Sequence, residues 1–316
     1  MALGTARLLI SCPDRKNIIA TVAGFIARQG GNILEADQHS DPEHGEFFMR
    51  VEIELDGFAL NRQTFGEAWE PVAAPFGMSW RVYWGNEIKR MAVLVSKESH
   101  CLNDILWRWK TGELRTQIAF VASNHQDLHD AADACAIPFH HLPIESQRSK
   151  VERSNSESQP SSNLEPSNLQ PSNLQPSNLG KDQESRLLSL LRDANVDLIV
   201  LARYMQVLSP EFVAQYPERI INIHHSFLPA FAGPRPYHQA FQRGVKIIGA
   251  TSHYVTDALD EGPIIAQATT PVDHRDTVDD LVRKGRDLER VVLATAVRQH
   301  VEDKILVSQN KTIVFD

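Results

Sequence analysis

The stretch that decides the fold is IINIHHSFLP, residues 220–229. It begins as a short apolar run and passes into a loop that Pro229 interrupts. Compact apolar runs of this kind are typical of strands in a parallel sheet that helices cover on both faces. Side chains two positions apart on a strand lie on the same face, so Asn222 and His224 should point together while His225 points away.

Three similar apolar runs precede this stretch, and helical patterns alternate with them. Strands and helices that alternate in this way predict an α/β domain with an open, mostly parallel sheet and helices on both faces. Ligands of such sheets bind at the carboxyl ends of the strands, where Asn222 and His224 are expected. The expected strands are residues 91–95, 118–121 and 198–201, and the expected helices are residues 102–109, 186–195 and 278–297.

The N-terminal part of the chain follows a different pattern. Apolar residues recur at helical spacing over residues 18–26, before a Gly30-Gly31 pair that is typical of a helix end. Apolar and mostly polar residues alternate over 47–55, which predicts a strand with one buried and one wet face. The whole order predicts a ferredoxin-like βαββαβ domain with both helices on one face of its sheet. The remaining elements are a strand at 8–12, a helix at 64–72 and a strand at 79–84.

These patterns predict two domains, over residues 1–85 and 89–316, and a low-complexity insert within the second. The insert covers about residues 147–182 and contains the five-residue repeat NLEPSNLQPSNLQPSNL. A proline at every fifth position forbids a continuous helix. The Pro, Ser and Asn content cannot bury enough apolar surface to fold, which predicts a disordered surface loop.

Composition excludes several classes of function. The net charge of −8 and the pI near 5.9 argue against broad binding to nucleic acid or an anionic membrane. Three scattered cysteines without a CxxC pair favour a reducing compartment. The N-terminus lacks the pattern of a secretory signal, and no run approaches the roughly 18 apolar residues of a membrane helix. These features predict a cytoplasmic protein.

The polar residues at the end of the apolar run 220–223 suggest chemistry only when a second segment is added. An Asn-x-His pair at a strand end is more often structural than catalytic. Adjacent strand residues cannot both reach one ion, so His224 and His225 do not indicate a metal site. Residues 249–265 add a strand, a loop carrying Asp260, and a glycine turn into a new strand.

Together these segments resemble the folate-dependent formyltransferase fold family. The resemblance rests on Asn-Ile-His-x-Ser-x-Leu-Pro, on Asp260 at 36 residues after His224 within Asp-x-Gly-x-Ile-Ile, and on LARYMQVLS at 201–209. It implies transfer of a formyl group from N10 of 10-formyltetrahydrofolate, with Asn222, His224 and Asp260 as catalytic residues. Thr251 and His253 would order a proton-relay water, although a core histidine is an equal interpretation of His253. The implied folate-binding residues are Arg203, Met205, Gln206, Val207, Leu208, Val255 and Asp257.

The N-terminal domain resembles an ACT domain, a regulatory module that usually binds amino acids at subunit interfaces. The resemblance rests on SCPDRKNIIA at 11–20 and on Gly30-Gly31-Asn32-Ile33. An ACT domain before a formyltransferase-like domain, with PYHQA at 236–240 and GVKIIGAT at 244–251, resembles the formyltetrahydrofolate deformylase family. The implied effector-binding residues are Asp14, Asn17, Gly31, Asn32 and Ile33. Asn17 stands where the family usually has glycine, but asparagine tolerates positive φ.

This second resemblance implies a hydrolase of one-carbon metabolism, linked to purine biosynthesis. The reaction would convert 10-formyltetrahydrofolate to formate and tetrahydrofolate, with no metal and no cofactor beyond the folate substrate. The resemblance further implies a homo-oligomer, with glycine and methionine as candidate effectors.

Two other functions remain open at this point. The loop at 95–102 has no glycine and carries Glu98, which disfavours the phosphate of a nucleotide acceptor. Lys97 and Arg243 nevertheless support an alternative function, a formyltransferase that acts on an amino-sugar or nucleotide amine. A folate-binding regulator without catalysis is the third possibility, which the intact Asn222, His224 and Asp260 disfavour.

Overall fold

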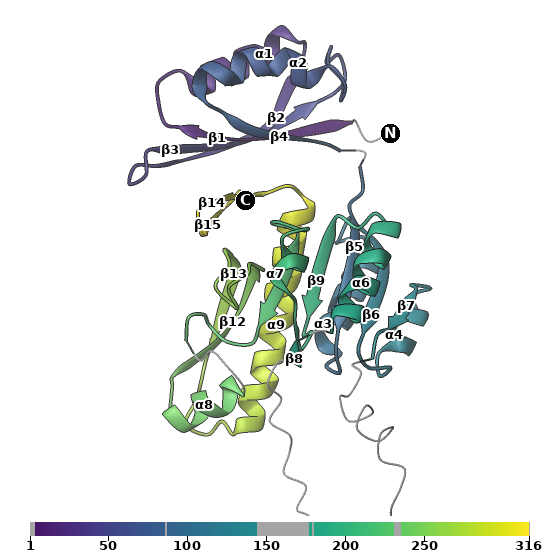
Figure 1. Ribbon diagram of the computed structural model, residues 1–316. Helices are drawn as coiled ribbons and strands as arrows, with labels where there is room; N and C mark the ends of the chain where they lie inside the picture. The colour runs from purple at the N-terminus through teal and green to yellow at the C-terminus, as the bar shows by residue number, and fades with distance from the viewer. Residues whose placement is uncertain (1–3, 86, 144–176, 179, 231–234, 316) are drawn as a thin grey trace, which may run out of the picture.

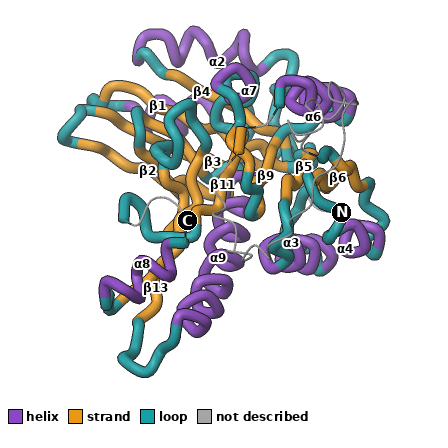
Figure 2. The backbone as a smooth tube through the Cα atoms, turned by 60° about the horizontal axis from the view of Figure 1, so that its bottom comes forward, coloured by secondary structure: helices purple, strands orange, loops and turns teal. Residues whose placement is uncertain are grey.

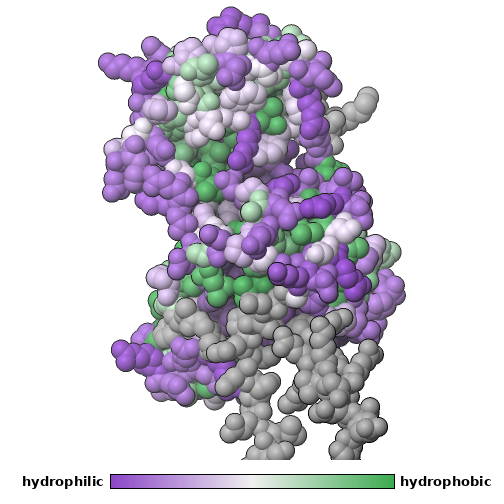
Figure 3. Space-filling model, in the orientation of Figure 1, coloured by the Kyte–Doolittle hydropathy of each residue, from purple (hydrophilic) through white to green (hydrophobic). Residues whose placement is uncertain are grey.

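The computed structural model describes residues 4–85, 87–143, 177–178, 180–230 and 235–315. They form two units, each built around its own sheet (Figure 1). In Figure 3 the outline of the molecule narrows where the two units meet. Nearly all of the predicted insert, residues 147–176 and 179, lies outside the described residues. Helix α6 begins at Lys181, so the last two residues assigned to the insert belong to a helix instead.

The N-terminal unit is the predicted βαββαβ arrangement. Its four strands are antiparallel in the order β2-β3-β1-β4. Both helices cover one face of this sheet (Figure 1), where Phe25, Phe65 and Trp69 form the centre of an aromatic core. The elements are β1 (Thr5–Pro13), α1 (Ile18–Arg28), β2 (Asn32–Asp41), β3 (Glu46–Glu54), α2 (Phe65–Ala73), a 3₁₀ turn (Ala74–Phe76) and β4 (Ser79–Trp84).

The other face of this sheet corrects the sequence interpretation of β3. Alternation predicted a wet face that includes Phe48 and Arg50, yet these side chains are buried, with relative exposures of 1% and 3%. Arg50 Nε donates to the main-chain oxygen of Asp303, 3.2 Å away in the second unit. Alternation identifies which residues share a face, but it cannot reveal that a second unit covers that face.

The second unit contains the predicted mostly parallel sheet. Its order is β13-β12-β11-β9-β5-β6-β7, and only the pairs β11–β12 and β12–β13 are antiparallel. The strands are β5 (Arg90–Val95), β6 (Gln117–Ser123), β7 (Phe139–His141), β9 (Leu198–Ala202), β11 (Ile220–His224), β12 (Ile247–Tyr254) and β13 (Ile264–Pro271). The helices are α3 (His100–Lys110), α4 (His129–Asp133), α6 (Lys181–Asp193), α7 (Pro210–Val213), α8 (Pro236–Arg243) and α9 (Val278–Val301).

Helices on both faces explain why the strands read as continuous apolar runs. Met91, Val93 and Val95 of β5 pack into a core with α3 and α9, whereas Ala92 and Leu94 pack into a second core with α6 and α7. Figure 2 shows α3 and α9 on the same side of this sheet. A strand buried on both faces has no position for polar side chains until it ends. Polar residues are therefore concentrated at the strand ends.

A buried cluster of charges joins the two units. The carboxylate of Asp303 lies 3.2 Å from Arg7 of β1 and pairs with Lys89 before β5. The Lys89 ammonium also donates to the carbonyl oxygens of His300 and Val301, each 3.1 Å away, at the end of α9. The chain then forms a terminal hairpin of β14 (Ile305–Ser308) and β15 (Lys311–Val314). Among the helices of the described ranges, none is both long and apolar enough to cross a membrane.

Candidate active site

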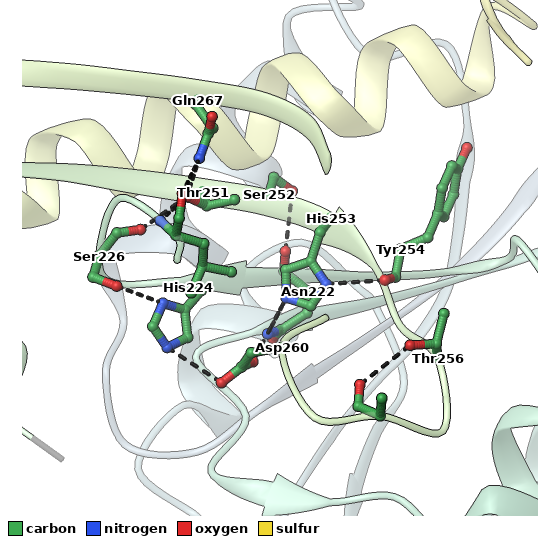
Figure 4. A network of polar contacts seen from close by, with 12 residues as sticks. Asn222, His224, Ser226, Thr251, Ser252, His253, Tyr254, Thr256, Asp260 and Gln267 are labelled. Atoms are coloured by element: carbon green, nitrogen blue, oxygen red, sulfur yellow. Dashed lines mark hydrogen bonds and ion pairs between the residues drawn. The ribbon is translucent and has the colours of Figure 1, made fainter. Parts of the chain in front are cut away.

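Strands β11 and β12 bring four of the predicted residues opposite one another. Their antiparallel register pairs Asn222 with His253 and His224 with Thr251. Directly opposed residues of an antiparallel pair lie on the same face of a sheet. The four side chains therefore share one face at the carboxyl end of β11, as Figure 4 shows.

Asp260 reaches this face from the loop that follows β12. Its Oδ2 lies 3.3 Å from Nε2 of His224, and its Oδ1 lies 3.6 Å from Nε2 of His253. The residue has a left-handed backbone with φ of 58°, a conformation that costs a non-glycine residue about 1 kcal/mol. Two residues later the chain passes so close to β12 that a Cβ on Gly262 would lie 1.8 Å from the Tyr254 oxygen. The turn and the glycine together place the carboxylate.

Ser226 determines which ring nitrogen of His224 faces Asp260 as a proton acceptor. Ser226 Oγ donates its only hydrogen to the carbonyl oxygen of Ala230 at 2.7 Å. It can then only accept from Nδ1–H of His224, which lies 3.0 Å away. In the neutral ring this leaves the lone pair on Nε2, beside the Asp260 carboxylate.

Asn222 is oriented by the second imidazole. His253 donates from Nδ1 to the Tyr254 carbonyl oxygen at 2.9 Å, so its neutral ring accepts at Nε2. The Asn222 amide nitrogen lies 3.2 Å from that Nε2 and donates one hydrogen to it. The second amide hydrogen of Asn222 is left for a substrate oxygen. Ser252 Oγ donates to the Asn222 carbonyl oxygen at 3.1 Å and fixes the backbone.

The electrostatics of the centre favour a neutral imidazole beside an ionised carboxylate. Burial lowers the pKa of His224, and this effect outweighs the opposite influence of Asp260. The pKa of Asp260 lies below its ordinary value, although burial raises it. A proton that arrives at Nε2 of His224 would then lie between the imidazole and the carboxylate, where its charge is stabilised.

The geometry corrects the predicted relay role of Thr251. Its side chain is fully buried, and Oγ1 donates to the Ser226 oxygen at 2.9 Å. The same oxygen accepts from Leu228 N at 3.0 Å and from Gln267 Nε2 at 2.9 Å. A hydroxyl has one donor and two acceptor positions, so no position remains for a relay water. Thr251 instead holds the loop after β11 against β12.

Comparison with known proteins agrees with this geometry. The formyl transferase family model matches residues 89–297, and the ACT domain model matches residues 6–59. A formyltetrahydrofolate deformylase from Synechocystis sp. is 49% identical over 311 residues, which cover 98% of each chain. The crystal structure of a formyltetrahydrofolate deformylase from Pseudomonas syringae pv. tomato has a TM-score of 0.87 at 43% identity, covering 100% of this chain and 96% of that one.

The chain belongs to the formyltetrahydrofolate deformylase family. The structure is also similar to that of a transformylase. Glycinamide ribonucleotide transformylase 1 from Symbiobacterium toebii has a TM-score of 0.60 at 28% identity, covering 74% of this chain and 97% of that one.

The segment predicted to bind folate is held in place by two parts of this deformylase-family chain. The Met205 amide donates to Ser96 Oγ, 3.1 Å away at the end of β5. Gln206 and Val207 form β10 (Gln206–Val207), which pairs in parallel with β8 (Ser177–Asn178). Leu208 lies in the hydrophobic core between α6 and α7. The segment therefore lies between the strand ends and two residues of the repeat itself, Ser177 and Asn178, which form a strand where the sequence predicted a disordered loop.

The predicted opposite wall of the folate site follows β12. Val255 packs against the same core and donates its amide to the Ile220 oxygen at 2.9 Å. Asp257 is exposed, and its Oδ1 accepts from the Ala258 amide at 3.1 Å. Arg203, the remaining predicted residue, forms an ion pair with Glu289, in which its Nε lies 3.5 Å from the carboxylate without making a hydrogen bond.

The predicted effector residues lie at the two ends of α1 and do not meet within one chain. Asp14 and Asn17 precede the helix, whereas Gly31, Asn32 and Ile33 follow it. A helix of 11 residues is about 16 Å long. Asn17 has φ of 75°, which confirms that asparagine adopts the left-handed turn where the family usually has glycine.

The loop after β5 keeps its charges paired. Arg286 of α9 lies 2.7 Å from Glu98, so this carboxylate does not present the unopposed negative charge that the sequence suggested. Lys97 and Arg243, which kept a transferase open, are both exposed. Exposed basic side chains are ordinary surface features and give no support to an acceptor site.

Two groups among the described residues have metal-ligand atoms within 4.8 Å of one another. One is Asp41, Glu43 and His44 at the tip of the β2–β3 hairpin, and the other is His100, Cys101 and Glu289. In the second group Arg203 already lies beside the Glu289 carboxylate. That fixed cation supplies the positive charge that a metal ion would bring.

Sequence reasoning missed Ser226, Gln267 and Glu289. Ser226 could have been found, because it lies two positions after His224 and alternation extends past the strand end. Gln267 belongs to β13, and Glu289 lies in the middle of α9. Neither position carries a local signal, because their partners come from other elements.

Proposed function

We propose that this protein hydrolyses 10-formyltetrahydrofolate to formate and tetrahydrofolate, with Asn222, His224 and Asp260 as the catalytic residues. The observation that carries the proposal is the contact of 3.3 Å between His224 and Asp260 beside the oriented amide of Asn222. Membership of the formyltetrahydrofolate deformylase family supports the substrate and the use of water.

The chemistry follows from the hydrogen atoms already assigned. A water oxygen bonds to the formyl carbon while its proton passes to the His224–Asp260 pair. The free amide hydrogen of Asn222 then donates to the oxyanion of the tetrahedral adduct, and the proton held between His224 and Asp260 stabilises its negative charge. The C–N10 bond breaks, and the proton moves to N10 as the amine of tetrahydrofolate leaves. Each donor of this kind contributes on the order of a hundredfold in rate.

We assign the pterin wall to the segment from Arg203 to Leu208 and to Val255 and Asp257. The first segment is anchored through Ser96 and the second through the pairing of Val255 with Ile220. The proposed reaction requires no cofactor and no metal, because the donors and the proton acceptor are side chains. Activity should therefore persist in the presence of EDTA.

We further propose that amino acids regulate the enzyme through the ACT domain. Because the predicted residues lie at opposite ends of α1, a pocket using both groups would combine one end from each of two chains. This supports a homo-oligomer as the regulated form. Glycine and methionine are the effectors to test. Three free cysteines and the lack of a membrane-spanning helix in the described ranges support a cytoplasmic location.

The test is incubation with 10-formyltetrahydrofolate without any amine, followed by measurement of formate. Formate and tetrahydrofolate should appear in equal amounts. Turnover that requires an added amine would reject hydrolysis and support a transferase. Binding of the folate without turnover would support a regulator that lacks catalysis.

The regulatory proposal is tested by the same assay with glycine or methionine added, together with analytical ultracentrifugation. A change in rate by either amino acid, in an oligomer, is the expected result. A stable monomer whose rate neither amino acid alters would contradict this part and leave hydrolysis standing.

A further inference from the structure

A buried carboxylate, Glu289, lies beside the proposed active site without taking part in the chemistry described so far. It sits in the middle of α9 with a relative exposure of 1%. Its Oε1 accepts from the Tyr237 hydroxyl of α8 at 2.7 Å, and its Oε2 accepts from Nε2 of His100 at the start of α3 at 2.7 Å. Arg203, directly after β9, lies 3.5 Å from Oε2. One carboxylate thus connects three helices with the end of a central strand.

The arrangement is built into the helix. Gly285 precedes Glu289 by one turn, and a Cβ there would lie 2.0 Å from the ring of Tyr237. A glycine inside a helix costs about 1 kcal/mol relative to alanine. At this position it allows Tyr237 to reach the carboxylate.

Glu289 is charged in the folded protein. Burial raises its pKa, but Arg203, His100 and Tyr237 outweigh burial and bring it to about 2. Cys101 of α3 also lies beside it, and burial raises the pKa of this thiol well above its ordinary value, so the thiol stays neutral. Glu289 and Arg203 therefore form an ion pair whose charges cancel.

Arg203 also acts on the catalytic histidine. Burial is the main influence that lowers the pKa of His224, and the charge of Arg203 adds to it, while Asp260 and Ser226 act in the opposite direction. The adjacent His225, whose ring centre is 5.1 Å from that of His224, has a pKa that burial and Arg203 lower to about 3 and is neutral. Arg203 is therefore a fixed positive charge near His224, and Glu289 is its counter-charge.

We infer that Glu289 is a positioning residue for the reaction: it pairs with Arg203 and cancels its charge, so that His224 can accept a proton from water. This inference rests on the proposed hydrolysis for its kinetic form. Without Glu289 the guanidinium would oppose formation of the imidazolium. Without Arg203 the carboxylate would favour it. The two substitutions therefore act in opposite directions, a result that a purely structural role would not produce.

The experiment follows the titration of His224 by NMR in protein carrying isotope-labelled histidine, with His224→Gln to assign the signal. Glu289→Gln should lower the titration midpoint by about one pH unit, and Arg203→Gln should raise it. The double variant should return close to the wild-type value. The pH profile of kcat should shift in the same directions. Asp287→Asn, an exposed charge change on the same helix, is the matched control and should shift neither.

An unchanged midpoint in Glu289→Gln, or equal shifts in Asp287→Asn, would overturn the inference. If Glu289→Gln does not fold, Arg203→Gln tests the opposite direction, and a midpoint that fails to rise overturns it equally. Because the NMR measurement needs no turnover, an enzyme that releases no formate would reject the proposed function without deciding the role of Glu289.

Discussion

Asp260 in the candidate active site and Asp303 at the junction of the two units have the same backbone conformation. Their charged partners and the directions of their pKa shifts differ. Both have left-handed backbones, with φ of 58° and 54°, and each lies between two basic side chains. Asp260 faces two imidazoles and its side chain is 20% exposed, whereas Asp303 faces Arg7 and Lys89 and its side chain is 3% exposed.

The difference lies in the partners. Imidazoles gain and lose protons near neutral pH, so a carboxylate between them can help to move a proton. Arginine and lysine keep their charge, so a carboxylate between them can only hold parts of the chain together. Burial raises the pKa of Asp303 despite both cations, whereas that of Asp260 lies below its ordinary value. The same residue type is suited to catalysis in one place and to domain attachment in the other.

The largest expected effect is on the catalytic rate, which should depend on Asp260 and not on Asp303. Asp260→Asn should lower kcat for formate release by about a hundredfold or more, because the protonated His224 loses its counter-charge. Folate affinity, measured by calorimetry, should stay within a few-fold of the wild type. If Asp260→Asn retains full activity, Asp260 has no role in the mechanism.

The next effect is on the stability of the fold, which should depend on Asp303. Asp303→Asn should lower the free energy of unfolding by about 3–5 kcal/mol, because Arg7 and Lys89 would keep buried charges without a partner. Urea denaturation measures this change, and kcat of the remaining folded enzyme should change little. Glu302→Gln is the control, since its side chain is 35% exposed and lies 3.6 Å from Lys304. Equal losses in both variants would contradict the special role of Asp303.

A smaller effect tests whether a polar group inside the active site can be purely structural. Thr251→Val should cost about 1–3 kcal/mol of stability, because buried partners of its hydroxyl lose their hydrogen bonds. The shape of the pH profile of kcat should not change. Thr269→Val, on the exposed side of β13, should leave stability almost unaffected. A shifted pH profile in Thr251→Val would restore the relay role.

The effect that is smallest per pH unit concerns the pH dependence of stability near Asp303. His300, which pairs with the Tyr254 hydroxyl at 2.7 Å, has a pKa that burial, with Lys89, lowers from 6.5 to about 3. In this pH range His300 is protonated in the unfolded chain but not in the folded chain. Stability is therefore lost as the pH falls from about 6.5 toward 3. His300→Asn should reduce this slope by about 1.4 kcal/mol per pH unit in denaturation series. An unchanged slope would show that His300 is not buried in its neutral form.

The sequence by itself determined the local features. Apolar runs located the central strands to within a residue or two at β5, β9 and β11, because burial on both faces leaves a continuous signal. Alternation placed Asn222 and His224 on one face, and the loop before Gly262 identified Asp260. These features depend on neighbours within a few positions.

Only the tertiary structure decided how those features meet. The register of β11 against β12 and the saturated hydroxyl of Thr251 depend on segments far apart in the chain. The hydrogen bond from Arg50 to Asp303 joins residues 253 positions apart. The contact between His100 and Glu289 joins residues 189 positions apart. A periodic pattern records which face of an element is buried, but not which element covers it. The counter-charge of Arg203 and the attachment at Asp303 therefore required the folded chain.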